Sequence, residues 1–377
     1  MNQDELSALL ERLIDRIDSN TTDEAEAAMV DNVADFLSPE RFARERQEFF
    51  LKCPQIVGFS GELGAPGTFI TRDVMDIPIV VARDKAGVLR AMVNACAHRG
   101  GRIADGCGSS PRLTCKIHGW TFNLDGSLFS RPMDKCFDSS GAQDRLTMLP
   151  VSERSGLIVV GARSDVSQDK VDRHLEEIES QFSGFSFRDM LTLDTRRFEV
   201  KANWKLVSAL SYESYHFAVL HRDSIAQAFA ANAVHDFFGR HSRWAFAQKG
   251  AEKLRELDRK DWPAAYPAVL SYNLFPGTVL IVSPGRDAQI LRTEPGTSPG
   301  TSVVHMIGGY RLKDKRKEAL EIFEFGVRAF ETEDLSAAIA SQQGLMAGRE
   351  KIHIGRNEPV VQFWHRLWRE SLEKNDA

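Results

Sequence analysis

Two short pairs of cysteine and histidine constrain this chain more than any other feature. Cys96-Ala-His98 is followed, after sixteen residues, by Cys115-Lys-Ile-His118. Two thiolates and two imidazoles are the ligand set of a [2Fe-2S] cluster in which cysteines hold one iron and histidines hold the other. Imidazole in place of thiolate raises the reduction potential of such a cluster. The two pairs therefore predict a role in electron transfer.

Structural zinc is the alternative occupant of the same four residues, because it also accepts two cysteines and two histidines. Zinc-finger sequences group Cys with Cys and His with His. Here each pair contains one residue of each kind, so each loop can give one ligand to each of two irons, which favours the cluster. Arg99-Gly100 and Gly119-Trp120 complete the motifs Cys-x-His-Arg-Gly and Cys-x-x-His-Gly-Trp. With these residues the segment resembles the Rieske family of [2Fe-2S] proteins.

Length and charge set further limits. At about 150 residues per domain, 377 residues suggest two or three domains. The net charge of -5 argues against a nucleic-acid surface, which needs clustered Lys and Arg. Residues 1–18 have the apolar spacing of a packing helix, and no apolar run is long enough for a signal peptide or a membrane span. We therefore expect a cytoplasmic protein with no nucleic-acid or membrane partner.

The fold class predicted from the sequence is α+β, in three parts. Residues 1–46 form N-terminal helices that we expect to pack on the catalytic domain, residues 47–162 form a small β domain with both ligand pairs, and residues 163–377 form a larger α+β domain. In the β domain, residues 77–83 and 89–94 are predicted strands around a turn at 84–87, and residues 122–129 are a predicted hairpin around Asp-Gly. Residues 165–183 and 325–349 are predicted helices, and residues 278–282 and 302–307 are predicted strands.

His216 and His221 are the candidate metal ligands of the larger domain. They are five residues apart, which on a regular helix separates their side chains by about 140°. Both can bind one metal only if the backbone is irregular there, and such irregular turns are typical of functional sites. Two imidazoles and one carboxylate form the facial triad of a non-haem Fe(II) oxygenase.

The second domain extends the family resemblance over nearly the whole chain. Asn203-Trp204-Lys205, Glu213, Tyr215-His216 and His221 resemble the iron-binding segment of the α (catalytic) subunit of Rieske non-haem iron oxygenases, the aromatic ring-hydroxylating dioxygenase family. The resemblance implies a Rieske domain inserted near the N-terminus and a helix-grip-like catalytic domain. It also implies a [2Fe-2S] cluster on Cys96, His98, Cys115 and His118, and a mononuclear Fe(II) on His216, His221 and one carboxylate.

The third iron ligand and the electron bridge follow from the same resemblance. Glu333-Asp334 followed by Gln343-Gly344-Leu345 resembles the family segment that supplies the carboxylate, so Asp334 is preferred to Glu331 and Glu333. Glu213 takes the place of the acidic residue that passes an electron from His118 of one subunit to the iron of the next, which implies a homotrimer. Most members have Asp there, and Glu is similar to relatives that oxidise carnitine, choline or betaine.

The resemblance predicts a terminal oxygenase component that uses O2 for mono- or dioxygenation. Its electrons come from NAD(P)H through a separate reductase, directly or by way of a ferredoxin, because the chain has no convincing nucleotide-binding motif. Phe229, Phe237, Phe238 and Trp244 are expected to line the pocket, which favours hydroxylation of a small hydrophobic, aromatic substrate in aromatic hydrocarbon catabolism.

Two alternatives remain open. One is a monooxygenase or demethylase of a quaternary ammonium or methylated substrate, with Trp244, Tyr266 and Tyr272 as an aromatic cage. The other is a Rieske electron carrier without oxygenase activity, whose second domain is structural.

Overall fold

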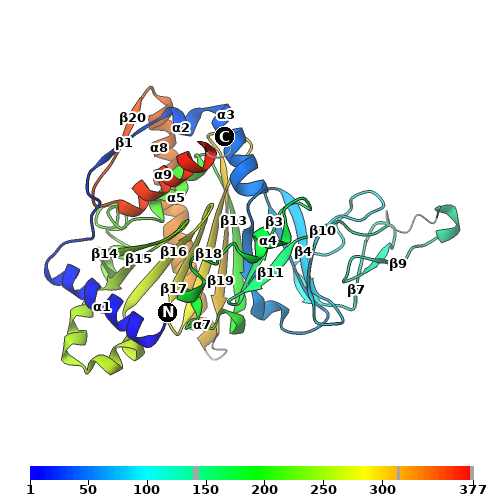
Figure 1. Ribbon diagram of the computed structural model, residues 1–377, viewed down its shortest axis with the longest axis horizontal. Coiled ribbons are helices and arrows are strands. Elements are labelled where there is room, and N and C mark those ends of the chain that lie inside the picture. Colours follow the sequence, from blue (N-terminus) through cyan, green and yellow to red (C-terminus); the bar gives the residue numbers. More distant parts are fainter. Residues whose placement is uncertain (139–143, 312–314, 374–377) are drawn as a thin grey trace. The chain divides into compact units, whose positions relative to one another are not determined.

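The computed structural model describes residues 1–138, 144–311 and 315–373, and the chain divides into two compact units (Figure 1). The smaller unit comprises Gln47–Glu176 and Ser186–Leu191. The larger unit comprises Met1–Arg46, Glu177–Phe185 and Thr192–Ala377. The α+β class is confirmed, because strands dominate the smaller unit while the larger one combines a sheet with helices.

The smaller unit is built from short antiparallel strands. In its described residues they form a five-stranded sheet in the order β10-β5-β4-β3-β6 and two three-stranded sheets, β11-β12-β2 and β7-β8-β9. The strands are β2 (Gln55–Phe59), β3 (Thr68–Val74), β4 (Ile77–Arg83), β5 (Leu89–Val93), β6 (Cys107–Ser109), β7 (Arg112–Thr114), β8 (Thr121–Asn123), β9 (Leu128–Ser130), β10 (Met148–Leu149), β11 (Val151–Arg154) and β12 (Leu157–Val160).

Turn chemistry explains the two predicted hairpins of this unit, and both are confirmed. Between β4 and β5, the carboxylate of Asp84 accepts hydrogen bonds from the amides of Ala86 and Val88, and Gly87 has a φ of 78°. Between β8 and β9, Gly126 has a φ of 84°. Glycine adopts such positive φ angles without the steric cost that a side chain brings. The predicted turn residues therefore fix the register of the strands on either side.

The larger unit contains a seven-stranded antiparallel sheet within its described residues, in the order β13-β19-β18-β17-β16-β15-β14 (Figure 1). The strands are β13 (Leu191–Val200), β14 (Phe229–Phe238), β15 (His241–Gln248), β16 (Ala268–Leu274), β17 (Thr278–Ser283), β18 (Asp287–Pro295) and β19 (Ser302–Tyr310), and β1 (Met29–Asn32) pairs with β20 (Lys351–Ile354). The α-helices of the chain are α1 (Gln3–Asp18), α2 (Ala34–Leu37), α3 (Pro39–Glu45), α4 (Gln168–Asp172), α5 (Trp204–Leu210), α6 (Ile225–Ala228), α7 (Arg316–Ala329), α8 (Leu335–Met346) and α9 (Pro359–Glu373).

The predicted N-terminal helix is present as α1, which lies beside the edge strand β14 (Figure 1). Its first turn closes with a capping box, in which Asn2 accepts from the amide of Glu5 and Glu5 accepts from the amide of Asn2. Leu10, Leu13 and Ile14 on its apolar face are fully buried. The sequence pattern thus fixes both where this helix begins and which face it buries.

The long helix predicted for residues 165–183 is wrong. Only α4 is α-helical there, and it is followed by turns and by a 3-10 turn at Glu179–Phe182. The boundary between the two units falls between Glu176 and Glu177, inside the predicted helix. The amides here bond to carbonyls three residues back, as from Glu176 to Arg173 and from Gln181 to Ile178. Such bonds tighten the backbone and interrupt the α-helical ladder.

A buried ion pair joins the N-terminal segment to α5. Lys205 Nζ lies 2.5 Å from Glu45 Oε1, and the indole nitrogen of Trp204 donates to Glu45 Oε2 over 3.0 Å. Asn203 donates to the backbone carbonyls of Phe36 and Pro299. The Asn-Trp-Lys motif therefore anchors the start of α5, from which the chain continues toward the predicted iron ligands.

None of the helices in the described ranges is both long enough and apolar enough to span a lipid bilayer.

A second buried pair makes the stability of the larger unit depend on pH. His365 Nδ1 lies 2.7 Å from Asp31 Oδ2, and both side chains are almost fully buried. Burial lowers the pKa of His365, although Asp31 opposes the shift. Below the ordinary histidine pKa of about 6.5, the unfolded chain takes up a proton that the folded chain excludes, so stability falls as the pH falls.

We expect His365→Asn to weaken this dependence, because asparagine can still donate to Asp31 but does not titrate. Between about pH 7 and pH 5 the wild-type unfolding free energy should drop by up to about 1.4 kcal/mol per pH unit more steeply than that of the variant. Urea unfolding followed by circular dichroism across this range measures both slopes. His353→Asn, on the exposed side of β20, controls for loss of a histidine. Equal slopes for wild type and His365→Asn would contradict the assignment.

Candidate metal centres and substrate pocket

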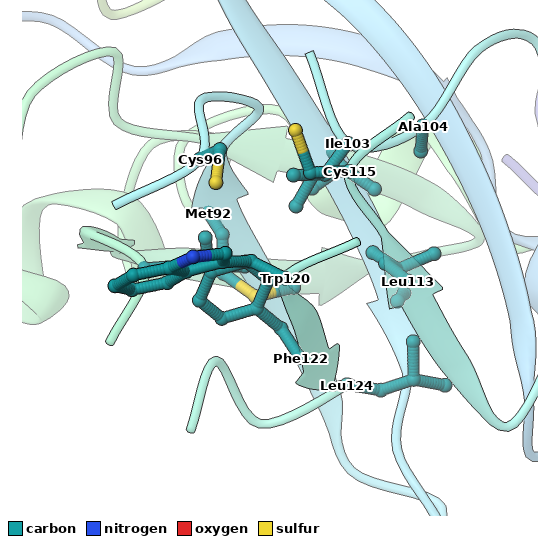
Figure 2. Close-up of a cluster of buried hydrophobic side chains, with 12 residues drawn as sticks. Met92, Cys96, Ile103, Ala104, Leu113, Cys115, Trp120, Phe122 and Leu124 are labelled. Carbon is teal, nitrogen blue, oxygen red and sulfur yellow. The ribbon is translucent and has the colours of Figure 1, made fainter. Parts of the chain in front are cut away.

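The four cluster residues lie on two loops of the smaller unit. Cys96 and His98 follow β5, while Cys115 and His118 occupy the loop between β7 and β8. The register of β7 and β8 pairs Thr114 with Thr121, so the second loop is the tip of a hairpin. Both cysteines are buried at one end of an apolar cluster that includes Trp120 and Phe122, with Leu124 at the opposite end (Figure 2).

Backbone hydrogen bonds give the two loops the same turn. The amide of Gly100 donates to the carbonyl of Cys96 over 2.8 Å, and that of Gly119 donates to the carbonyl of Cys115 over 2.9 Å. Both glycines have positive φ angles, of 75° and 74°. A Cβ atom on Gly101 would lie 2.5 Å from Ile117 Cδ1. The Gly residues of both motifs therefore let the two loops turn sharply and approach each other.

The ligand atoms of these loops fit a mixed Cys/His cluster. The rings of His98 and His118 are 4.6 Å apart, and the thiols of Cys96 and Cys115 are within hydrogen-bonding reach of each other. Burial raises the pKa of the Cys96 thiol. His98 Nδ1 is buried and has no hydrogen-bond partner among the described residues. A buried, unpartnered imidazole nitrogen is costly unless it binds a group such as a metal.

The two histidines differ in exposure. His118 is exposed and its Nε2 lies 2.7 Å from a guanidinium nitrogen of Arg99, whereas His98 is partly buried and stacks on Trp120. Because arginine can only donate, Nε2 of His118 is the acceptor in this contact. The exposed His118 is therefore the member of the set that another protein surface can reach.

The segment that carries Glu213, His216 and His221 is a series of turns and not a helix. Helix α5 ends at Leu210, and no α-helix resumes before Ile225. The predicted irregularity at the two histidines is thus confirmed. Tyr212 holds the start of the segment, because it is fully buried and stacks on Trp364 of α9, with ring centroids 5.2 Å apart.

Two hydrogen bonds fix the rest of this segment to the sheet. The indole nitrogen of Trp244 on β15 donates to the carbonyl of Ser211, and the hydroxyl of Ser214 donates to the carbonyl of Ala231 on β14. Aromatic packing and these bonds replace the backbone ladder that a helix would provide. The chain is therefore free to turn both histidines to one side.

A π-helical turn, Phe330–Asp334, places the acidic residues between α7 and α8. The wider turn brings Glu333 and Asp334 to the same side, although they are adjacent in sequence, and π-turns of this kind are frequent at functional sites. Asp334 is buried, Glu333 is partly buried, and Glu331 is exposed. Of the three candidate carboxylates, the structure brings only Asp334 to the Nε2 atoms of both histidines.

The geometry of this group fits a single metal ion. Asp334 Oδ1 lies 3.6 Å from His216 Nε2 and 3.3 Å from His221 Nε2, and the three ligand atoms lie within 4.8 Å of one another. With bonds of about 2.1 Å at right angles, neighbouring ligand atoms are separated by roughly 3 Å. Two neutral imidazoles and one carboxylate on one side of an ion are the donor set of a facial triad.

Each histidine has a second carboxylate on its other ring nitrogen. Glu213 Oε1 lies 2.5 Å from His216 Nδ1, and Glu333 Oε2 is hydrogen bonded to His221 Nδ1. Burial lowers the pKa of His221, but its hydrogen bonds to the carboxylates of Asp334 and Glu333 outweigh this effect, and the net shift is upward. With Nδ1 donating to a carboxylate, Nε2 is left as the atom that faces the metal.

A cavity of about 210 Å³ opens from this triad across one face of the sheet. Its walls are alternate residues of successive strands, because side chains on a strand point to opposite faces with a period of two. The lining includes Phe229 of β14, Trp244 and Phe246 of β15, Ser271 of β16, Ile281 of β17 and Leu291 of β18. Helix α7 covers the opposite side with Ile322 and Phe325.

Four aromatic rings form a continuous wall beside the triad. Phe217, which contacts both histidines, packs on Phe246 at 5.3 Å between ring centroids, and Phe246 contacts Phe229 and stacks on Trp244. We call Phe217, Phe229, Trp244 and Phe246 the aromatic wall. Its rings present π-faces and apolar edges within reach of a ligand bound next to the metal.

The predicted pocket residues are partly correct. Phe229, Trp244 and Tyr266 line the cavity, but Phe237, Phe238 and Tyr272 do not. Tyr272 follows Ser271, so it points to the other face of β16, where it packs on Phe182. Phe237 contacts Phe363 and is half exposed. The strand period that excludes Tyr272 also identifies Phe246, two residues after Trp244.

Comparison with known proteins places these two sites in one family. The model of the Rieske [2Fe-2S] domain matches residues 53–148, and the model of the ring hydroxylating alpha subunit (catalytic domain) matches residues 187–374. The chain belongs to the Rieske non-haem iron oxygenases, as an α subunit. It therefore combines a Rieske [2Fe-2S] domain with a catalytic domain that has a His/His/Asp candidate mononuclear iron site. Membership of this oxygenase family disfavours the electron-carrier alternative.

Named relatives of this Rieske oxygenase are similar over most of its length. The carnitine monooxygenase oxygenase subunit of Acinetobacter baumannii is 27% identical over 323 residues, which are 82% of this chain and 83% of that protein. Among solved structures, the quaternary ammonium Rieske monooxygenase CntA with L-carnitine has a TM-score of 0.76 at 22% identity, covering 93% of this chain and 96% of that one. Naphthalene 1,2-dioxygenase from Rhodococcus sp. with indole has a TM-score of 0.71 at 17% identity, covering 98% of both chains. Both structures share the fold.

Sequence reasoning did not identify Glu333 as the partner of His221. The two residues are 112 positions apart, so no local spacing relates them. Ser224, whose hydroxyl donates to Glu333 Oε2 over 2.6 Å, was also missed. Both depend on the π-turn, which the sequence does not signal.

The carboxylates at the triad should differ in their effect on the mononuclear iron. We expect Asp334→Ala to lose this iron, Glu333→Gln to bind it about 10- to 100-fold more weakly, as outer-shell substitutions do, and Glu331→Ala to bind it like wild type. Iron titration of the apo protein, followed by metal analysis, measures the three affinities.

The visible absorption of the cluster provides the internal control, because none of these substitutions touches the Rieske domain. All three variants should keep it. Full retention of mononuclear iron in Asp334→Ala would remove that residue from the ligand set.

Proposed function

We propose that this chain is the terminal oxygenase subunit of a monooxygenase that hydroxylates a quaternary ammonium or related N-methylated substrate. The observation that carries the proposal is the similarity over 82% of the chain to a carnitine monooxygenase oxygenase subunit. This finding supports the quaternary ammonium alternative better than the aromatic substrate that apolar composition had favoured. Glu213, in place of the more common Asp, points in the same direction.

The aromatic wall is compatible with such a substrate. A quaternary ammonium group cannot donate hydrogen bonds, so it is recognised through the π-faces of aromatic rings and through opposite charge. Phe217 and Trp244 contact each other in the wall, and Phe217 also contacts His216 and His221. A methylated ammonium group held there would keep its C–H bonds next to the proposed iron.

Seven residues would hold the cofactors. Cys96, His98, Cys115 and His118 would bind the [2Fe-2S] cluster, and His216, His221 and Asp334 would bind Fe(II), with Glu213 between the two centres. When bound, the ferrous ion would supply the activation of O2. One C–H bond becomes C–OH, the second oxygen atom leaves as water, and two electrons and two protons are consumed. A separate reductase, directly or through a ferredoxin, would deliver the electrons from NAD(P)H.

The protein residues around the proposed iron orient and shield it. Glu213 and Glu333 fix the two imidazoles through Nδ1, and Phe217 with the rest of the aromatic wall limits the space for water beside them. Excluding water strengthens every electrostatic interaction in the site. The imidazoles that would hold the metal are thus kept in one orientation toward the substrate space.

Electron transfer between subunits of a homotrimer is part of the proposal. His118 is exposed, and the segment near Glu213 exposes two apolar side chains, Tyr215 at 69% and Val219 at 84%. Apolar side chains exposed together beside a functional site are typical of a protein contact surface. The contact that would cover them is the Rieske domain of a neighbouring subunit.

Product analysis under 18O-labelled O2 tests the substrate class. With a reductase present, we expect one labelled oxygen atom in the product of at least one of carnitine, glycine betaine and choline. Aromatic hydrocarbons of similar size should consume reductant without labelled product. Mass spectrometry of the products decides between the two classes. Labelled diols from the aromatic panel, with no product from the amines, would reverse the proposal.

Glu213→Gln tests the electron bridge. The substitution keeps the size of the side chain and removes its charge. In enzyme reconstituted with saturating iron, so that both metal centres are filled, we expect product formed per reduced cluster in a single turnover to fall about tenfold or more. Rapid-quench analysis of the pre-reduced enzyme measures this yield.

Mixed oligomers show whether the bridge joins two subunits. Chains with Cys96→Ser have no functional cluster, and chains with Asp334→Ala have no functional iron site. Co-assembled, the two variants should regain activity that neither has alone. Persistent inactivity of a mixture shown to co-assemble would place the electron path within one chain.

A further inference from the structure

The cavity has a polar end at the hairpin between β17 and β18. Its lining there consists of Ser283, Arg286, Asp287 and Gln289, in contrast to the aromatic wall on β14 and β15. Gly285, with a φ of 79°, allows the tight turn before Asp287, which is the first residue of β18. The side chain of Asp287 is buried, with 9% of its surface exposed.

Sheet register places this polar end far from the aromatic wall. Trp244 pairs with Ser271, Ser271 with Ile281, and Ile281 with Gln289, so one row of cavity residues crosses four strands. At about 4.8 Å between neighbouring strands, the row spans roughly 14 Å. Asp287 lies two residues before Gln289, on the same face of β18. A substrate held at the aromatic wall therefore has space between itself and Asp287.

Asp287 is a carboxylate of this cavity that does not belong to the proposed iron site. Among the described lining residues, the other carboxylate is Asp334, the proposed iron ligand. Among the described residues, Arg286 forms the ion pair with Asp287, its Nε lying 3.6 Å from Oδ2, and the Ser283 side chain is hydrogen bonded to the same carboxylate. The Arg286 side chain is half exposed, so solvent screens its charge.

The environment of Asp287 is therefore short of positive charge. Burial raises the pKa of Asp287, and Arg286 together with the Ser283 hydrogen bond only partly offsets the shift. A buried carboxylate in a largely apolar cavity is costly unless a positive charge approaches it. A cationic ligand in the cavity would relieve this cost, whereas an uncharged ligand of the same shape would leave it in place.

Asp287 also stands where two cavities meet. Arg286, Asp287 and Ile322 line both the cavity at the triad and a second cavity beside α7. The second cavity contains another acidic residue, Glu318, but its carboxylate is exposed and pairs with Lys315 over 3.1 Å. The buried carboxylate at the junction is thus distinct from the screened ion pair of the second cavity.

We propose that Asp287 is the counter-ion that makes the cavity select a cationic substrate over an uncharged one of equal size. The negative charge of Asp287 would attract the cationic substrate across the cavity, while the aromatic wall would contact the substrate directly. The inference rests on the proposed function, since it identifies the residue that recognises the charge of a quaternary ammonium substrate.

Paired ligands separate charge from shape. Choline and its carbon isostere, in which a tert-butyl group replaces the trimethylammonium group, have nearly the same size and differ in charge. Their dissociation constants with the metal-loaded enzyme follow from quenching of tryptophan fluorescence, because Trp244 lines the cavity. We expect wild type to prefer choline, and Asp287→Asn to lose choline affinity roughly tenfold while binding the isostere as before.

Glu318→Gln is the matched control, since it removes an acidic charge from the second cavity only. It should keep the wild-type preference. If Asp287→Asn still prefers choline, the inference is wrong. It is also wrong if the variant loses equal affinity for choline and for the isostere, because the carboxylate would then have a structural role.

The two proposals fail separately. If wild type gives labelled product from a quaternary amine but Asp287→Asn keeps its preference for choline, only the role of Asp287 is wrong. If wild type neither binds choline better than its isostere nor oxidises any quaternary amine, both proposals are wrong.

Discussion

The convergence of His216, His221 and Asp334 on one point is the constraint on which the larger unit depends. Three acceptor atoms within 4.8 Å of one another are unfavourable without a cation between them. The fold nevertheless holds them there, with a turn segment fixed by Tyr212 on one side and a π-turn on the other. Both are departures from regular helix, and each is required because a regular helix would point one of the ligands away.

The seven-stranded sheet supports this site because one of its faces lines the cavity while the other packs into the core. On β16, Ser271 faces the cavity while Tyr272, one residue later, packs into the core. The same alternation repeats on each strand that the cavity crosses, so a rigid hydrogen-bonded layer supplies both the core and the pocket wall. A change of one cavity residue can alter substrate contact without loosening the layer, because its neighbours on the strand face the other way.

The sequence predicted those features of the fold that depend on interactions between residues close together in the chain. Turn residues such as Gly87 and Gly126 and the apolar face of α1 each act within a few residues, and their consequences are confirmed in the structure. The helix expected across Glu176 was wrong because the boundary between units interrupts it, and a boundary is a property of long-range packing. The partnership of His221 with Glu333 was missed for the same reason: the contact joins segments 112 residues apart. Sequence alone also could not assign pocket residues before the strand register was known.

Charge around the proposed iron does not by itself explain a preference for a cationic substrate. Glu213, Glu333 and Asp334 place three carboxylates around two imidazoles, against the two positive charges of a ferrous ion, so the centre keeps an excess negative charge. Any family member with a bridging acid and this ligand set shares most of that charge, whatever it oxidises. Discrimination between a cation and a neutral ligand must therefore come from residues beyond the metal. In this cavity Asp287 is the residue proposed for that role, because its buried charge lies on the far side of the substrate space and its ion-pair partner, Arg286, is half exposed.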